Sequence, residues 1–107
     1  MSAGSLPPDL ARVFAHLDAP EAIERLLTDL LSPAELRSLR ERWGIVRGLA
    51  AGKTQREVRD ELGVGIATVS RGAHQLRHGT GGFALGLEAL RQLEAGARSS
   101  PAEEPTS

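Results

Sequence analysis

The sequence contains no cysteine, and this absence excludes several kinds of site at once. Disulfide frameworks, thiolate zinc sites, iron–sulfur clusters and cysteine nucleophiles all need that residue. The chain has three histidines, His16, His74 and His78, which leave little material for acid–base catalysis. No acid, base and nucleophile come together in the pattern, so we expect neither an enzyme nor a metal site or cofactor.

Aromatic residues are also scarce, with two phenylalanines, one tryptophan and no tyrosine. Proteins that hold single-stranded nucleic acid stack bases on aromatic side chains, so this composition does not suit that function. No hydrophobic run approaches the roughly 20 residues of a membrane-spanning helix, and residues 1–5 lack the basic and apolar parts of a secretion signal. The sequence therefore predicts a soluble, cytoplasmic protein with no membrane partner.

Strand patterns are missing as well, because no stretch rich in valine, isoleucine or threonine alternates with a period of two. Apolar residues recur instead at helical spacing. We predict an all-α protein of six short helices, near residues 9–17, 20–31, 33–50, 55–62, 66–78 and 83–95. A chain of 107 residues has room for one small domain, and a partner subunit would help to bury its apolar surface.

Several residues indicate where these helices begin. Asp9 is expected to cap the first helix, and Pro20 suits the start of the second. Ser32, followed by Pro33 and by Glu35 three residues after the cap, predicts the start of the longest helix. That helix carries a narrow apolar seam with Trp43 in the core or in a dimer interface; the seam consists of Leu36, Leu39, Trp43, Val46 and Ala50.

The chain divides into three segments. Residues 1–18 form an N-terminal arm and helix, and residues 19–95 form the helical domain. Residues 96–107, rich in proline, serine and glutamate, are predicted to be a disordered tail.

The net charge of −1 hides an uneven distribution. Residues 42–78 hold seven basic and three acidic residues, a net charge of +4, whereas residues 1–41 carry −3 and residues 79–107 carry −2. Positive charge is therefore concentrated in the middle of the chain, where a phosphate backbone could use it.

That basic segment contains the pattern of a helix-turn-helix over residues 54–78. Thr54 caps the first helix with Glu57 completing a capping box, and Gly63 suits a tight turn. The second helix is small and polar on its outer face, so it could enter the major groove of DNA. The expected DNA-binding residues are Gln55, Arg56, Arg59, Gly65, Ile66, Ala67, Thr68 and Ser70. An ordinary helical hairpin with solvated charges remains the alternative.

Three stretches of this chain resemble the tryptophan operon repressor family: residues 31–52, residues 55–57, and residues 61–72, which read ELGVGIATVSRG. The resemblance covers roughly residues 19–76. It implies an intertwined all-α homodimer that binds a double-stranded DNA operator and represses tryptophan-related genes. It also implies L-tryptophan, or a close indole relative, as the corepressor.

The resemblance further implies a set of ligand-binding residues. Arg71 meets the carboxylate of the amino acid, the indole lies against Arg71 and Arg42, and Gly72 leaves room for it. The amino group is met by helix-end carbonyls in the other subunit, in the region of Asp29, Leu31 and Ser32. A guanidinium suits a carboxylate and an aromatic ring, and a helix C-terminus suits an ammonium group.

This sequence departs from the family pattern in three places. The loop over residues 52–55 is one residue shorter than in the best-known members. Gln75 replaces a small hydroxyl residue close to the amino end of the ligand, and Asp29 replaces an apolar residue. Two alternatives therefore stay open: a related regulator that takes a different indole or no ligand, and a helical protein-interaction module.

Overall fold

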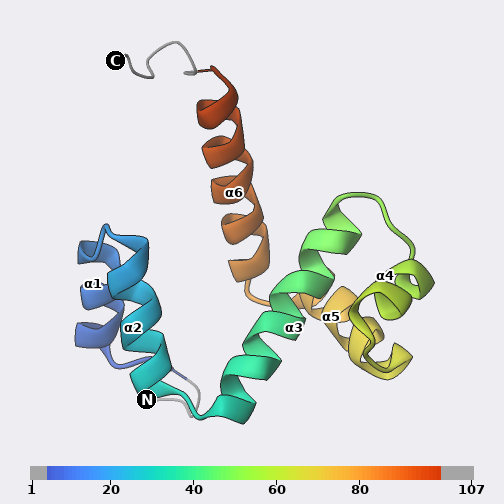
Figure 1. The fold of residues 1–107 in the computed structure, drawn as a ribbon, viewed down its shortest axis with the longest axis horizontal. Helices are drawn as coiled ribbons and strands as arrows, with labels where there is room; N and C mark the ends of the chain where they lie inside the picture. The colour runs from blue at the N-terminus through green and yellow to red at the C-terminus, as the bar shows by residue number, and fades with distance from the viewer. Residues whose placement is uncertain (1–4, 100–107) are drawn as a thin grey trace. The chain divides into compact units, whose positions relative to one another are not determined.

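The computed structural model describes residues 5–99 and forms them into six α-helices, with no strand in that range (Figure 1). The all-α prediction and the number of helices are confirmed. The helices are α1 (Pro8–His16), α2 (Pro20–Leu30), α3 (Pro33–Ala50), α4 (Gln55–Leu62), α5 (Ile66–His78) and α6 (Gly82–Ser99). No helix among the described residues is long and apolar enough to cross a membrane.

The chain splits into two compact units, residues 1–39 and residues 40–107. The first unit contains α1, α2 and the start of α3. Neither α1 nor α2 contains a buried residue, and Val13 and Leu30 are 45% and 49% exposed. Residues 5–39, the part of this unit that the structure describes, therefore have no buried apolar core of their own.

Helix starts in the first unit largely follow the local sequence. Pro20 occupies the first turn of α2, as predicted. Ser32 and Glu35 form the predicted reciprocal cap of α3, with Glu35 N–H donating to Ser32 Oγ at 3.1 Å and Ser32 N–H donating to Glu35 Oε1 at 2.8 Å. The prediction for Asp9 was wrong. Pro7 is the N-cap of α1, and no side chain caps the helix. Asp9 lies inside the first turn, where its negative charge interacts favourably with the helix dipole.

The second unit has a small apolar core made by three helices. Ile45 of α3, Val58 of α4 and Val69 of α5 are buried together, and the half-buried residues Leu49 and Val64 pack against them. This cluster fixes the α4–α5 pair to the second half of α3.

The predicted seam of α3 was only partly right. Val46 is fully buried, but Leu39 is 43% exposed and Trp43 is half-buried. The α4–α5 pair instead packs on the neighbouring face of α3, which carries Ile45 and Leu49. A periodic pattern shows that a helix has an apolar face, but the packing partner decides which part of that face is covered.

Close approach of α4 to α3 depends on small residues. A β-carbon on Gly48 would lie 2.9 Å from Val58 Cγ2, and one on Gly44 would lie 3.3 Å from Leu62 Cδ1. Leu62 therefore lies over Gly44 yet remains 41% exposed.

The last helix, α6, differs from its prediction in length. It has 18 residues, as many as α3, and it continues through residues 96–99, which had been assigned to the tail. The remaining residues of that tail, 100–107, lie outside the described part of the chain. Gly86 of α6 lies beneath the ring of Trp43, because a β-carbon there would be 3.3 Å from the ring atoms Cη2 and Cζ3.

Candidate nucleic-acid interface

The structure forms α4 and α5 as the predicted helix-turn-helix, and both helices lie beside the C-terminal half of α3 in Figure 1. Thr54 and Glu57 make the predicted capping box: Glu57 N–H donates to Thr54 Oγ1 at 3.1 Å, and Thr54 N–H donates to Glu57 Oε1 at 2.8 Å. Gly63 ends α4 in the left-handed conformation, with φ 70° and ψ 29°, and its N–H bonds to Arg59 O. The turn therefore needs the positive φ for which glycine was expected.

Helix α5 has an apolar inner face that is buried and an outer face that carries small, solvent-accessible side chains. Val69 and Ala73 are buried against the core, whereas Ala67 and Ser70 are exposed and Thr68 is half-buried. Ile66 is 45% exposed, which places it on the rim of the pair. Gly65 precedes the helix as its N-cap and has no atom within 4 Å of a β-carbon position. All five predicted DNA-binding residues at the start of α5 are thus at least partly exposed to solvent.

The cations of the first helix differ in their surroundings. Arg56 is exposed and makes no ion pair within the described residues. Arg59 is half-buried, and its Nη2 atom lies 2.9 Å from Asp60 Oδ1. Lys53, in the loop before α4, pairs with Glu61 at 2.6 Å. Arg56 is therefore the cation of α4 that is ready to meet a phosphate, while Arg59 must first exchange its carboxylate partner.

Two contacts that involve predicted DNA-binding residues were not foreseen from the sequence. Ser70 Oγ donates a hydrogen bond to Gln55 Oε1 at 2.9 Å, and this bond joins α5 to the first residue of α4. Arg71 Nη2 lies 3.4 Å from Thr68 Oγ1, a long contact between two residues three positions apart on one helix. Neither contact has a signal in the sequence, because each depends on how the two helices cross or on a side-chain rotamer.

The residues that the resemblance assigns to an amino-acid ligand fall in both units, and each group is described by itself. In the first unit, Asp29 is exposed, Leu31 is half-buried, and Ser32 caps α3. In the second unit, Arg42 and Arg71 are exposed guanidinium groups on α3 and α5. Both arginines are therefore accessible to a ligand.

The other two assigned residues in the second unit have neighbours of their own. Gly72 is half-buried and faces Ile45. Gln75 is exposed and lies over the end of α5, since a β-carbon on Gly79 would be 2.9 Å from its Nε2 atom. Close packing therefore supplies a reason for a glycine at position 72 that is independent of any ligand.

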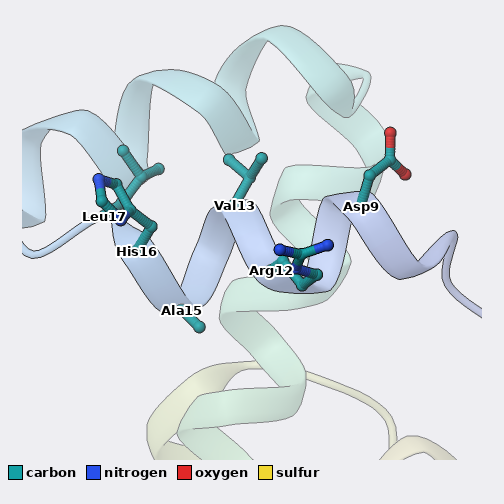
Figure 2. Close-up of a pocket in the computed structure, with 6 residues that line it drawn as sticks. All are labelled: Asp9, Arg12, Val13, Ala15, His16 and Leu17. Atoms are coloured by element: carbon teal, nitrogen blue, oxygen red, sulfur yellow. The ribbon is translucent and has the colours of Figure 1, made fainter.

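Two hollows lie away from these residues. One, of about 680 Å³, follows α1, and Figure 2 shows the side chains of Asp9, Arg12, Val13 and His16 around it. The other, of about 530 Å³, lies between the ends of α3 and α5 and one face of α6. Its lining residues are Arg47, Ala50, Ala51, Leu76, Ala84, Leu87, Glu88, Leu90, Arg91 and Glu94. None of the predicted ligand residues lines either hollow.

One carboxylate beside the second hollow has a strongly shifted pKa. Hydrogen bonds from Arg91 and Gln92 lower the pKa of Glu88 to about 2. Arg91 donates both bonds through its guanidinium, with Nη2 at 2.6 Å from Oε2 and Nε at 3.0 Å from Oε1. Elsewhere in the second unit, the rings of His74 and His78 lie one turn apart, with centroids separated by 4.8 Å and planes tilted by 44°. The described residues contain no group of three side chains that could hold a metal ion.

An all-α scaffold that carries a basic helix pair around a left-handed glycine defines a helix-turn-helix protein. Residues 9–91 match the family described as Trp repressor protein, and the chain belongs to that family. Members of the family are DNA-binding regulators and not enzymes.

Individual relatives match over shorter stretches. The chain is 46% identical over 55 residues to a Trp operon repressor homolog of Vibrio vulnificus, which covers 50% of this chain and 54% of the relative. It is 45% identical over 58 residues to the corresponding Vibrio cholerae homolog, covering 53% and 56%. The uncharacterized protein YerC of Bacillus subtilis is 30% identical over 74 residues, covering 69% and 71%. The chain thus spans about half the length of the Trp operon repressor homologs, and no solved structure matches it.

Proposed function

We propose that this chain is a sequence-specific transcriptional repressor that binds double-stranded DNA through α4 and α5. The observation that carries the proposal is the outer face of α5, where small and polar side chains stand exposed above a buried core. A helix of this kind can approach base edges closely, and Arg56 supplies positive charge beside it. Family membership supports the same function.

We further propose that the repressor works as a homodimer. The second unit leaves large apolar residues on α6 in solvent, with Leu85 75% exposed and Leu93 71% exposed. Its buried core, in the part of the chain that the structure describes, consists of Ile45, Val46, Val58, Val69 and Ala73. Burying the remaining apolar surface against a second copy would add stabilisation in proportion to the area covered.

The corepressor in this proposal is L-tryptophan or a close indole relative. Arg71 and Arg42 are exposed guanidinium groups on two helices of the second unit, and either can meet a carboxylate or the face of an aromatic ring. A ligand activates the repressor only if it binds the DNA-competent arrangement more tightly than the inactive one. Gln75 and Asp29 differ from the family pattern, so a different indole is the second candidate.

Gel mobility shift with a duplex selected from random sequence tests DNA binding. Arg56→Ala is expected to weaken binding at least fivefold and to make the salt dependence shallower, because a phosphate contact releases counterions. Arg25→Ala, which removes an exposed charge from α2, is the control and is expected to bind like the wild type. Equal binding by Arg56→Ala and the wild type would contradict the assignment of α4.

Calorimetry tests the ligand separately. L-tryptophan is expected to bind the wild type and to bind Arg71→Ala and Arg42→Ala at least tenfold more weakly. If Arg71→Ala keeps the wild-type affinity, Arg71 does not bind the carboxylate. If the wild type does not bind L-tryptophan but binds another indole, the chain is a related regulator with a different ligand.

A further inference from the structure

One side-chain hydrogen bond links the two helices of the helix-turn-helix. Ser70 Oγ, in the second turn of α5, donates to Gln55 Oε1, on the first residue of α4, at 2.9 Å. That distance is within the normal range for an O–H donor. The two residues are 15 positions apart in the chain, so the bond exists only because the helices cross here.

Both ends of this bond rest on fixed backbone. Thr54 caps the turn of α4 in which Gln55 lies, and Val58, one turn later, is buried. Ser70 follows Val69, which is fully buried in the same cluster. The core already holds the backbone of both helices in place at these residues. The bond therefore adds order to the side chain of Gln55 and not to the backbone.

The bond uses the one donor of Ser70 and leaves the donors of Gln55 available. A serine hydroxyl has one O–H donor, and Ser70 uses it in the hydrogen bond to the amide oxygen of Gln55. The amide nitrogen of Gln55, on the opposite branch of the side chain, keeps both of its N–H donors. Phosphate oxygens only accept hydrogen bonds, so Gln55 can serve a phosphate in this arrangement and Ser70 cannot.

Resting on the proposed function, we propose that Ser70 is a positioning residue: it holds the amide of Gln55 so that the N–H donors contact a DNA phosphate. Arg56, the next residue, is exposed and brings positive charge to the same end of α4. Without the Ser70 hydroxyl the amide can rotate and present its oxygen, which a phosphate repels. Ser70 therefore acts on DNA through Gln55, whereas the sequence alone predicted that Ser70 itself binds DNA.

The test is a double-mutant cycle in DNA binding with Ser70→Ala, Gln55→Ala and the double variant. The probe is a duplex of about 30 base pairs that the wild type selects from random sequence. We expect Ser70→Ala to bind about fivefold more weakly and Gln55→Ala about tenfold more weakly. The double variant is expected to match Gln55→Ala, because Ser70 has no other role in the contact.

A methylphosphonate scan of the same duplex separates positioning from a purely structural role. Replacing one phosphate by the neutral analogue should weaken the wild type at a particular position, and both single variants should lose that sensitivity there. Ser70→Thr keeps a hydroxyl and is expected to restore both affinity and sensitivity. Melting temperatures of all variants should stay within about 2 °C of the wild type, because the bond lies at the surface.

Two results would overturn the inference. Independent losses that multiply in the double variant, with the wild type binding normally, would refute the positioning role and leave the proposed function intact. A wild type that selects no duplex would overturn the proposed function, and the inference with it.

Discussion

Gly72 of α5 lies directly against Ile45 of α3: a β-carbon on Gly72 would stand 2.7 Å from Ile45 Cγ2. Real β-carbons do not approach another atom so closely, and the Ile45 branch is too near its backbone to swing away. Gly72 therefore lets the second helix of the helix-turn-helix settle on the core. The resemblance to the repressor family implied a ligand role at this position, whereas the structure shows a packing role.

The first prediction concerns this contact. Gly72→Ala is expected to lower the free energy of unfolding by about 1–3 kcal/mol, although alanine is the better helix former, because the added methyl group overpacks Ile45. Urea denaturation measures the change. Gly96→Ala is the control, since nothing lies within 4 Å of a β-carbon there, and it should not destabilise the protein. Equal stability of both variants would contradict the close approach.

The turn of the helix pair gives the second prediction. Gly63 has φ 70°, and nothing lies within 4 Å of a β-carbon built on it. Gly63→Ala is therefore expected to destabilise by about 1–2 kcal/mol through backbone strain alone. Gly63→Asn, which tolerates the left-handed region better, should recover part of that loss. Chemical denaturation that ranks alanine equal to glycine would show that the turn does not require positive φ.

The third prediction concerns the ion pair of Arg59 with Asp60. Asp60→Asn removes the competing carboxylate and should strengthen DNA binding about two- to fivefold, with a steeper salt dependence. Stability should change by less than about 0.5 kcal/mol, because exposed pairs contribute little. Asp18→Asn makes the same charge change on an exposed residue of the first unit and serves as the control. Equal gains in both variants would mean that only overall charge matters.

The fourth prediction is a titration. Donation from Arg91, and then from Gln92, lowers the pKa of Glu88 from 4.5 to about 2. Because the folded pKa lies below the unfolded one, the stabilisation is present above pH 4.5 and disappears as the pH falls towards 2. Carboxyl-carbon NMR should show a midpoint near 2 in the wild type and a clearly higher one in Arg91→Met. A wild-type midpoint at the ordinary value would contradict the hydrogen bonds in α6.

Local signals could be predicted from the sequence because they act within a few residues. The capping boxes at Ser32 and Thr54 and the glycine that ends α4 were all identified, since each depends on one turn of backbone. Asp9 was misassigned because Pro7 and Pro8 already set the start of α1 without a side-chain cap. The end of α6 was predicted too early because glycine commonly ends a helix, yet α6 continues through Gly96 to Ser99.

Features that depend on the packing of helices against one another could not be predicted from the sequence. The face of α3 that became buried carries Ile45, which lies one residue away from the predicted seam. The bond between Ser70 and Gln55 requires the crossing of two helices, so neither residue signals its partner. The outer face of α5 could be predicted because its small residues and its buried residues alternate with helical period. The sequence thus identified the accessible residues of the site but not the contacts among them.

The central claim is that one small molecule and DNA bind this helix-turn-helix cooperatively. Affinity for the selected duplex, measured by fluorescence anisotropy with and without saturating L-tryptophan, tests it most directly. We predict at least tenfold tighter DNA binding with the amino acid, and an equal gain in L-tryptophan affinity when DNA is present, because linkage is reciprocal. Tight DNA binding that is unchanged by L-tryptophan and by other indoles would contradict the corepressor, and no DNA binding under either condition would contradict the claim as a whole.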